Sequence, residues 1–149
     1  MASAEREIVI NVPAEQVFNY LADVSKHPEW GNAQHKLEVK KTSDGPVGQG
    51  STFASVGHQF GRNEDTVTIT EYVPGQRLVY QAEGGAGLIK NWFELAPADG
   101  GTRVKKGFEP LKSKFPFALL APLAIRLSVP GALQGDLERI KAKLEGGVN

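Results

Sequence analysis

Near its C-terminal end the chain carries one long amphipathic helix pattern, the largest apolar helix that the sequence offers for covering a sheet. Its apolar residues recur almost entirely at spacings of three and four, apart from the step across Pro130: Leu123, Leu127, Leu133, Leu137, Ile140 and Leu144. Such spacing places them on one helix face. Pro130-Gly131 is expected to kink this helix or split it in two, because proline removes a helical hydrogen bond.

The middle of the chain alternates apolar and polar residues in segments joined by short turns. The alternation predicts strands at residues 36–40, 51–60, 62–73, 77–83, 88–95 and 102–108. Val73-Pro74-Gly75-Gln76 places proline and glycine where a type II turn needs them. Connections this short favour an antiparallel meander over parallel strands with crossover helices.

The N-terminal part begins with a further strand and continues with two short helices. Ile8, Ile10 and Val12 alternate with polar residues and predict a strand over residues 5–12. Pro13 suits the first position of a helix that buries Val17, Phe18 and Leu21. Residues 25–30 predict a second helical turn, which Gly31-Asn32 ends.

This order of elements predicts one α+β domain over residues 1–149. A sheet with a polar outer face must cover its inner face, and the C-terminal helix is the apolar element that can do so. We therefore expect a curved antiparallel sheet wrapped around that helix, with the short helices closing one end. Space left between sheet and helix predicts an internal apolar pocket, and such pockets are common ligand sites.

Composition excludes several kinds of site. The 149 residues include no Cys, so thiol nucleophiles, thiolate metal sites and disulfides are excluded. The 17 basic and 17 acidic residues balance, whereas a nucleic-acid-binding protein usually carries a basic excess. The three histidines, His27, His35 and His58, are not spaced as metal ligands. We expect no metal, no cofactor and no nucleic-acid partner.

No targeting or membrane-spanning segment is predicted. The first residues lack the basic and apolar regions of a secretory signal. The most apolar stretch, residues 115–129, contains Pro116, Pro122 and Arg126. It is shorter than the roughly 20 apolar residues that a spanning helix needs. We expect a cytoplasmic protein, monomeric or homodimeric, without stable membrane insertion.

Six segments, in order along nearly the whole chain, resemble the START-like superfamily, also called the polyketide cyclase/dehydratase and lipid transport or SRPBCC superfamily. They are residues 8–23, His27–Trp30, Val47–Ser51, Thr70–Leu78, Gly101–Val104 and Leu137–Glu145. The resemblance implies a helix-grip fold, in which a seven-stranded antiparallel sheet surrounds the C-terminal helix and a hydrophobic cavity. Members bind or carry lipids, sterols, polyketides or hormones, and a minority catalyse cyclisation or dehydration.

Strand alternation identifies side chains that face the expected cavity. Lys106 shares a face with Val104 and Phe108, and Asn91 shares one with Phe93. The residues predicted to line the cavity are Tyr80, Asn91, Phe93, Lys106, Phe108, His58, Trp30, Leu123 and Leu127. Structural roles compete with this interpretation: Lys106 could extend to solvent, His58 could be a solvated strand residue, and Trp30 could be packing alone.

Three functions fit these features. The first is binding of a hydrophobic small molecule, such as a lipid, sterol, quinone or polyketide-like compound, in the internal cavity. The second is a polyketide cyclase or dehydratase that uses Lys106, Tyr80, His58 and Asn91, although no His–Asp or carboxylate pair can be placed on the cavity face. The third is a protein-interaction module that uses the apolar residues 115–125. The sequence favours binding over catalysis.

Overall fold

The sheet of the computed structural model, which describes residues 3–58, 62–115 and 117–146, has seven antiparallel strands in the order β1-β7-β6-β5-β4-β3-β2. From β2 onward each strand therefore pairs with the next one along the chain, as the predicted meander requires. The strands are β1 (Ala4–Ile10), β2 (Glu38–Lys41), β3 (Thr52–Gly57), β4 (Asn63–Val73), β5 (Arg77–Gly84), β6 (Gly87–Ala98) and β7 (Gly101–Ser113).

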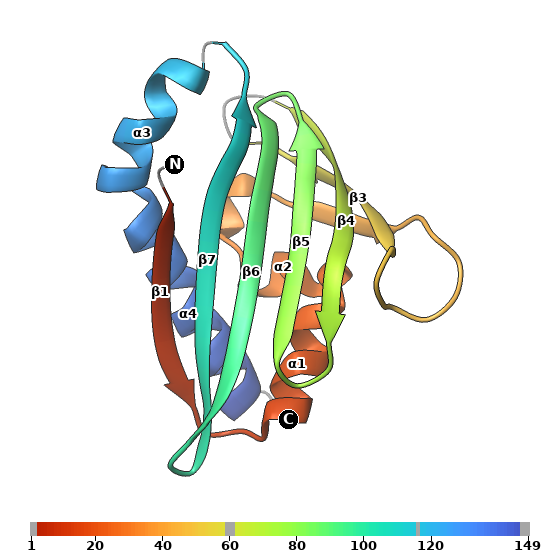
Figure 1. Ribbon diagram of the computed structural model, residues 1–149, viewed down its shortest axis with the longest axis vertical. Coiled ribbons are helices and arrows are strands. Elements are labelled where there is room, and N and C mark those ends of the chain that lie inside the picture. Colours follow the sequence, from red (N-terminus) through yellow and green to blue (C-terminus); the bar gives the residue numbers. More distant parts are fainter. Residues whose placement is uncertain (1–2, 59–61, 116, 147–149) are drawn as a thin grey trace.

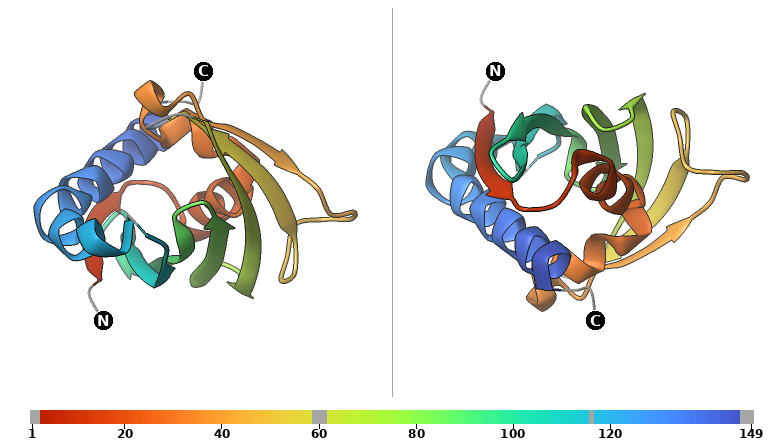
Figure 2. Two further views of the ribbon diagram at one scale, coloured as in Figure 1. Left: turned by 90° about the horizontal axis from the view of Figure 1, so that it is seen from above. Right: turned by 90° about the horizontal axis from the view of Figure 1, so that it is seen from below.

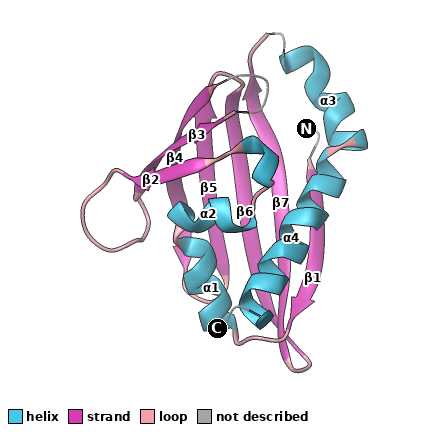
Figure 3. Ribbon diagram, turned by 180° about the vertical axis from the view of Figure 1, so that it is seen from behind, coloured by secondary structure: helices cyan, strands magenta, loops and turns pink. Residues whose placement is uncertain are grey.

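Helices cover the concave face of this sheet. The described helices are α1 (Ala14–Ala22), α2 (His27–Trp30), α3 (Phe117–Leu127) and α4 (Val129–Gly146), with single 3-10 turns at Val24–Lys26 and Ala33–His35; α1, α2 and α4 lie over the concave face. Figure 1 shows α4 crossing behind the sheet, and Figure 3, seen from behind, shows α4 in front of the sheet with α1 and α2 beside it. Figure 2 shows the curved sheet and α4 enclosing a common interior. The predicted helix-grip fold is confirmed.

The predicted C-terminal helix is divided, and the break is at Ser128. The axes of the two helices, α3 and α4, are bent by 59°. The Ser128 carbonyl accepts from Ala132, so Pro130 lies in the first turn of α4, where its missing N–H has no helical partner to lose. Of the described residues, no single helix is long and apolar enough to cross a membrane, although α3 and α4 pass that test jointly as a bent pair.

The core lies between the inner face of the sheet and α4. Four apolar side chains of α4 are buried there at helical spacing: Leu133, Leu137, Ile140 and Leu144. Phe18 and Leu21 of α1 complete the same cluster. The buried Thr102 hydroxyl donates to the Val12 carbonyl at 2.8 Å, which holds the segment entering α1 against β7. Burial at this scale stabilises each large side chain by about 1.5–3 kcal/mol.

Several strand boundaries differ from the prediction. The strand expected at residues 51–60 ends at Gly57, and residues 59–60 lie outside the described residues. The last two strands are longer than expected, reaching Ala98 and Ser113. Irregularities in register occur between Ile69 and Glu71 and between Leu88 and Ile89. The alternation is therefore unbroken along β6 from Asn91 to Leu95 and along β7 from Thr102 to Phe108.

Candidate functional site

A buried ion pair lies between the sheet and α4. Lys106 of β7 is only 3% exposed, and its Nζ lies 3.9 Å from Oδ2 of Asp136. The other oxygen of Asp136 accepts from the Arg139 guanidinium at 2.7 Å. Two cations thus share one carboxylate at the inner edge of α4.

Aromatic rings surround the ammonium group of Lys106. Its Nζ lies 5.5 Å from the centroid of the Trp30 ring and 5.3 Å from that of Phe93. Burial lowers the pKa of Lys106, and the negative charge of Asp136 partly opposes this shift. Burial also raises the pKa of Asp136, against the opposing effects of Lys106 and Arg139. Both shifts disfavour the charged forms, because the surroundings of the pair solvate charge poorly.

Trp30 supplies a buried hydrogen-bond donor to this region. Its indole Nε1 is buried and has no hydrogen-bond partner among the described residues. The ring stacks on His27 with centroids 4.0 Å apart and contacts Phe93 edge-on at 5.8 Å. The backbone carbonyl of Trp30 accepts from Nε of Arg139 at 2.7 Å. Arg139 thereby links α2 to α4 above the buried pair.

Tyr80 and two partly buried side chains extend this region along the sheet. Tyr80 of β5 is buried, with its ring 6.5 Å from that of Phe93. Burial and the nearby Asp136 raise the pKa of its hydroxyl, so it stays a neutral donor. Asn91 pairs across the sheet with Tyr80 of β5 and Phe108 of β7. Asn91 and Phe108 are both partly buried. Strand alternation thus oriented Tyr80, Phe93 and Lys106 correctly.

Three residues predicted to line the cavity lie elsewhere. His58 is exposed because β3 ends at Gly57, and its backbone N–H donates to His35 at 2.8 Å. Leu123 and Leu127 are 55% and 73% exposed. They belong to α3, which turns away from the interior at Ser128, so the predicted placement of all three was wrong.

Asp136 and Arg139 were missed by the sequence interpretation. A signal for Asp136 exists: it lies three residues after Leu133 and four before Ile140, so it borders the buried face of α4. No group of three or more His, Asp or Glu residues in the described ranges is arranged to hold a metal ion.

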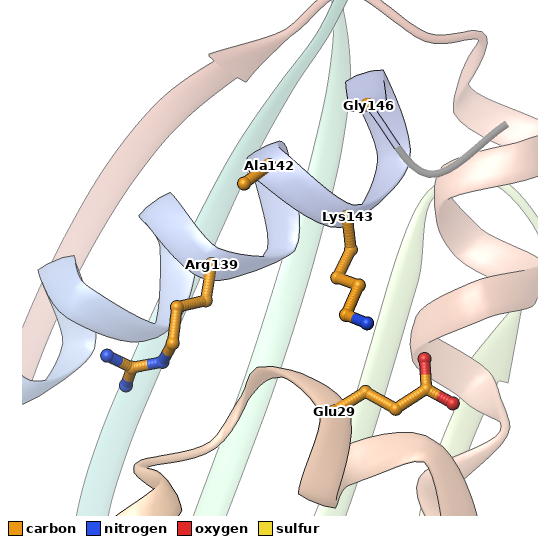
Figure 4. A pocket seen from close by; sticks show the side chains of 5 residues that line it. All are labelled: Glu29, Arg139, Ala142, Lys143 and Gly146. Carbon is orange, nitrogen blue, oxygen red and sulfur yellow. The ribbon is translucent and has the colours of Figure 1, made fainter. Parts of the chain in front are cut away.

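Two hollows formed by the described residues lie on the surface. One, about 420 Å³ in volume, lies between α2 and the end of α4 and is lined by Glu29, Arg139, Ala142, Lys143 and Gly146. Figure 4 shows Glu29 and Lys143 extending toward each other across it. The other, about 320 Å³, is lined by Glu5, Arg6, Glu7 and Lys105. Neither is the predicted internal cavity, whose place holds Trp30, Phe93 and Lys106 side chains.

The partly buried His27 predicts acid-sensitive stability. Burial, together with the charges of Lys106 and His35, lowers the pKa of His27 to about 3. His27 is therefore neutral when folded but gains a proton below about pH 6.5 when unfolded. The contribution of His27 to the free energy of unfolding should be fully present above that pH. Toward pH 3 the free energy of unfolding should fall by at most about 1.4 kcal/mol per pH unit.

Urea unfolding at a series of pH values measures this effect. His27→Phe keeps a ring on Trp30 and should remove about 2 kcal/mol of the loss between pH 6.5 and 4.5. His58→Phe, at an exposed position, is the matched control and should leave the wild-type profile. An unchanged acid profile in His27→Phe would show that His27 is protonated in the folded protein.

Solved structures of similar fold were found over the whole chain. TTHA0849 from Thermus thermophilus has a TM-score of 0.75 and 16% identity, and each chain is covered over 99% of its length. Protein CV1439 from Chromobacterium violaceum has a TM-score of 0.70 and 17% identity, with 97% of both chains covered. DynU16, described as a putative protein in the dynemicin biosynthetic locus, has a TM-score of 0.64 and 15% identity; the match covers 99% of this chain and 48% of DynU16. At these identities the likeness shows the fold alone.

A search of curated proteins gives no match. The family model described as "Polyketide cyclase / dehydrase and lipid transport" matches residues 1–145. With its seven-stranded sheet gripping α4 and a match over nearly its whole length, the chain belongs to the polyketide cyclase/dehydrase and lipid transport family.

Proposed function

We propose that this protein binds a largely apolar small molecule with one polar end, such as a lipid, sterol, quinone or polyketide-like compound, between the sheet and α4. The observation that carries the proposal is the Nε1 of Trp30, which has no hydrogen-bond partner within the described part of the chain, beside the buried ammonium of Lys106. An unsatisfied buried donor costs about 1–3 kcal/mol, and an oxygen of a ligand would remove that cost. Phe93, Leu137 and Ile140 offer apolar contact to the rest of the molecule.

The opening to this site is proposed to be the hollow between α2 and α4. Arg139 forms part of its wall and also bonds to the Trp30 carbonyl and to Asp136. A ligand that passes Arg139 therefore reaches Trp30 and Lys106 directly. Binding requires α2 and α4 to separate, because these bonds close the route in the present conformation.

A fluorescent fatty acid, dansylaminoundecanoic acid, serves as the probe. We expect saturable binding, and Lys106→Met should weaken it about 10- to 100-fold, since a hydrogen bond to a charged group contributes about 1.5–3 kcal/mol. Lys105→Met is the matched control, because Lys105 is the neighbouring residue on the outer face of β7. Absence of saturable binding, or equal weakening by both variants, would reject the proposed site.

A second candidate function is catalysis of the cyclase or dehydrase type. It is favoured by the lowered pKa of Lys106, because burial increases the neutral amine form that can act as a base or attack a carbonyl. An amine and a ketone form an imine and release water, and borohydride reduces that imine to a stable secondary amine. Incubation with 2-undecanone and borohydride should then label Lys106 and leave Lys106→Met unlabelled. Without an adduct on Lys106, imine chemistry is rejected while binding of the fatty acid is unaffected.

A further inference from the structure

The helix α3 presents an uncovered apolar face. Large apolar side chains in and just before it are between 55% and 81% exposed: Phe115, Leu119, Leu120, Leu123 and Leu127. At 100° per residue the four leucines fall on one side of the helix. Ile125, on the opposite side, is buried with Ala4 and Leu133. The helix is thus attached by its narrow inner side, and exposed apolar surfaces of this kind mark interaction sites.

The charged residues nearest to this leucine face along the chain all have one sign. Lys112, Lys114 and Arg126 lie in the segment from Pro110 to Gly135, which contains no Asp or Glu. All three basic side chains are exposed. Arg126 follows Leu119 by seven residues, so it borders the leucine face. The surface that complements α3 is therefore apolar inside and negatively charged around it.

A second copy of the chain does not meet this description. A two-fold contact through α3 places the same residues of both copies together, so the basic side chains would face one another. Like charges brought together oppose association. A bilayer containing anionic lipids offers acyl chains for the leucines and negative headgroups for the lysines and the arginine.

We propose that α3 is a docking helix that lies in the interface of an anionic membrane. Its axis lies along the surface, with the leucine face toward the acyl chains and Arg126 at the headgroups. Docking of this kind does not require a spanning helix, and of the described helices none qualifies singly. The proposal is independent of the interior site, since Trp30 and Lys106 take no part in it.

Flotation of the full chain with vesicles tests the proposal. We expect binding to vesicles of phosphatidylcholine with phosphatidylglycerol, weaker binding to phosphatidylcholine alone, and a decrease as salt rises. The variant Leu119→Glu/Leu123→Glu should lower the partition coefficient about tenfold or more. Lys114→Ser/Arg126→Ser should lower it about fivefold per residue on anionic vesicles.

The control is Val73→Glu, which adds one of the two negative charges of the leucine variant, at an exposed apolar position on β4. It should bind as the wild type does. The replaced leucines are exposed, so the variants should keep the wild-type melting temperature. The proposal is overturned by absence of flotation with anionic vesicles, by undiminished binding of the leucine variant, or by a dimer in sedimentation that this variant dissociates.

Discussion

Replacing Asp136 with alanine is expected to lower the free energy of unfolding by about 3–5 kcal/mol, because a buried charge loses its partner. Lys106 is 3% exposed and Asp136 is the carboxylate paired with it, at 3.9 Å. Removing Asp136 leaves the ammonium among aromatic rings, where it must either stay charged without compensation or lose its proton. Arg139 loses its 2.7 Å bond at the same time.

The matched variants at Lys106 separate charge from packing. Lys106→Met keeps similar volume, and Asp136 keeps Arg139 as its partner, so the variant should lie within about 1 kcal/mol of the wild type or exceed it. Lys106→Met/Asp136→Ala should recover most of the loss of Asp136→Ala. Urea unfolding at neutral pH measures all three, and a double variant as unstable as Asp136→Ala would show that the loss has another source.

The pH dependence of Asp136→Ala gives an independent check. Burial lowers the pKa of Lys106 in the folded protein below its unfolded value near 10.5. The unfolded chain then binds more protons between those two values, so stability rises with pH through that window. The deficit of Asp136→Ala should therefore shrink as the pH approaches 10.5, and the corresponding slope should be absent when Lys106 is methionine.

The side chains on the inner face of the sheet could be predicted from the sequence, because the alternation of inward and outward residues is unbroken in the parts of β6 and β7 that carry the site. Lys106 and Phe93 lie in stretches of β7 and β6 without a register shift, so period-two reasoning oriented them correctly. The prediction for His58 was wrong because the strand was predicted to end at residue 60, whereas β3 ends at Gly57. The predictions for Leu123 and Leu127 were wrong because helical spacing does not reveal the 59° bend between α3 and α4. Because of this bend, the apolar residues of α3 do not face the interior that those of α4 face.

The partners across the core could not be predicted from local pattern. Asp136 meets Lys106 only because α4 crosses β7 at that point, and the crossing depends on how the whole sheet curves. Arg139 reaches Trp30 across 109 residues of sequence. Contacts of this kind are decided by packing between distant elements, whereas periodicity reports only which side of its own element a residue occupies.

Truncation of Trp30 to alanine should lower the free energy of unfolding by about 3–5 kcal/mol, since a fully buried indole leaves a large cavity. The ring contacts His27 and Phe93, and Lys106 lies over it. Trp30→Phe keeps part of this packing and removes the buried N–H that has no acceptor. Removing that donor offsets about 1–3 kcal/mol of the free energy lost through reduced packing. The free energy of unfolding of the phenylalanine variant should therefore stay within about 1.5 kcal/mol of that of the wild type.

Stability and binding should then separate at this one residue. If Nε1 of Trp30 donates to the ligand, Trp30→Phe loses about 2- to 10-fold in affinity for dansylaminoundecanoic acid, the range of one neutral hydrogen bond. Trp92→Phe is the control, because the Trp92 indole donates to Glu5 on the outer face at 2.9 Å; its affinity should be unchanged. Wild-type affinity in Trp30→Phe would mean that the unpartnered donor is a cost that the fold tolerates, and that Lys106 alone distinguishes the site.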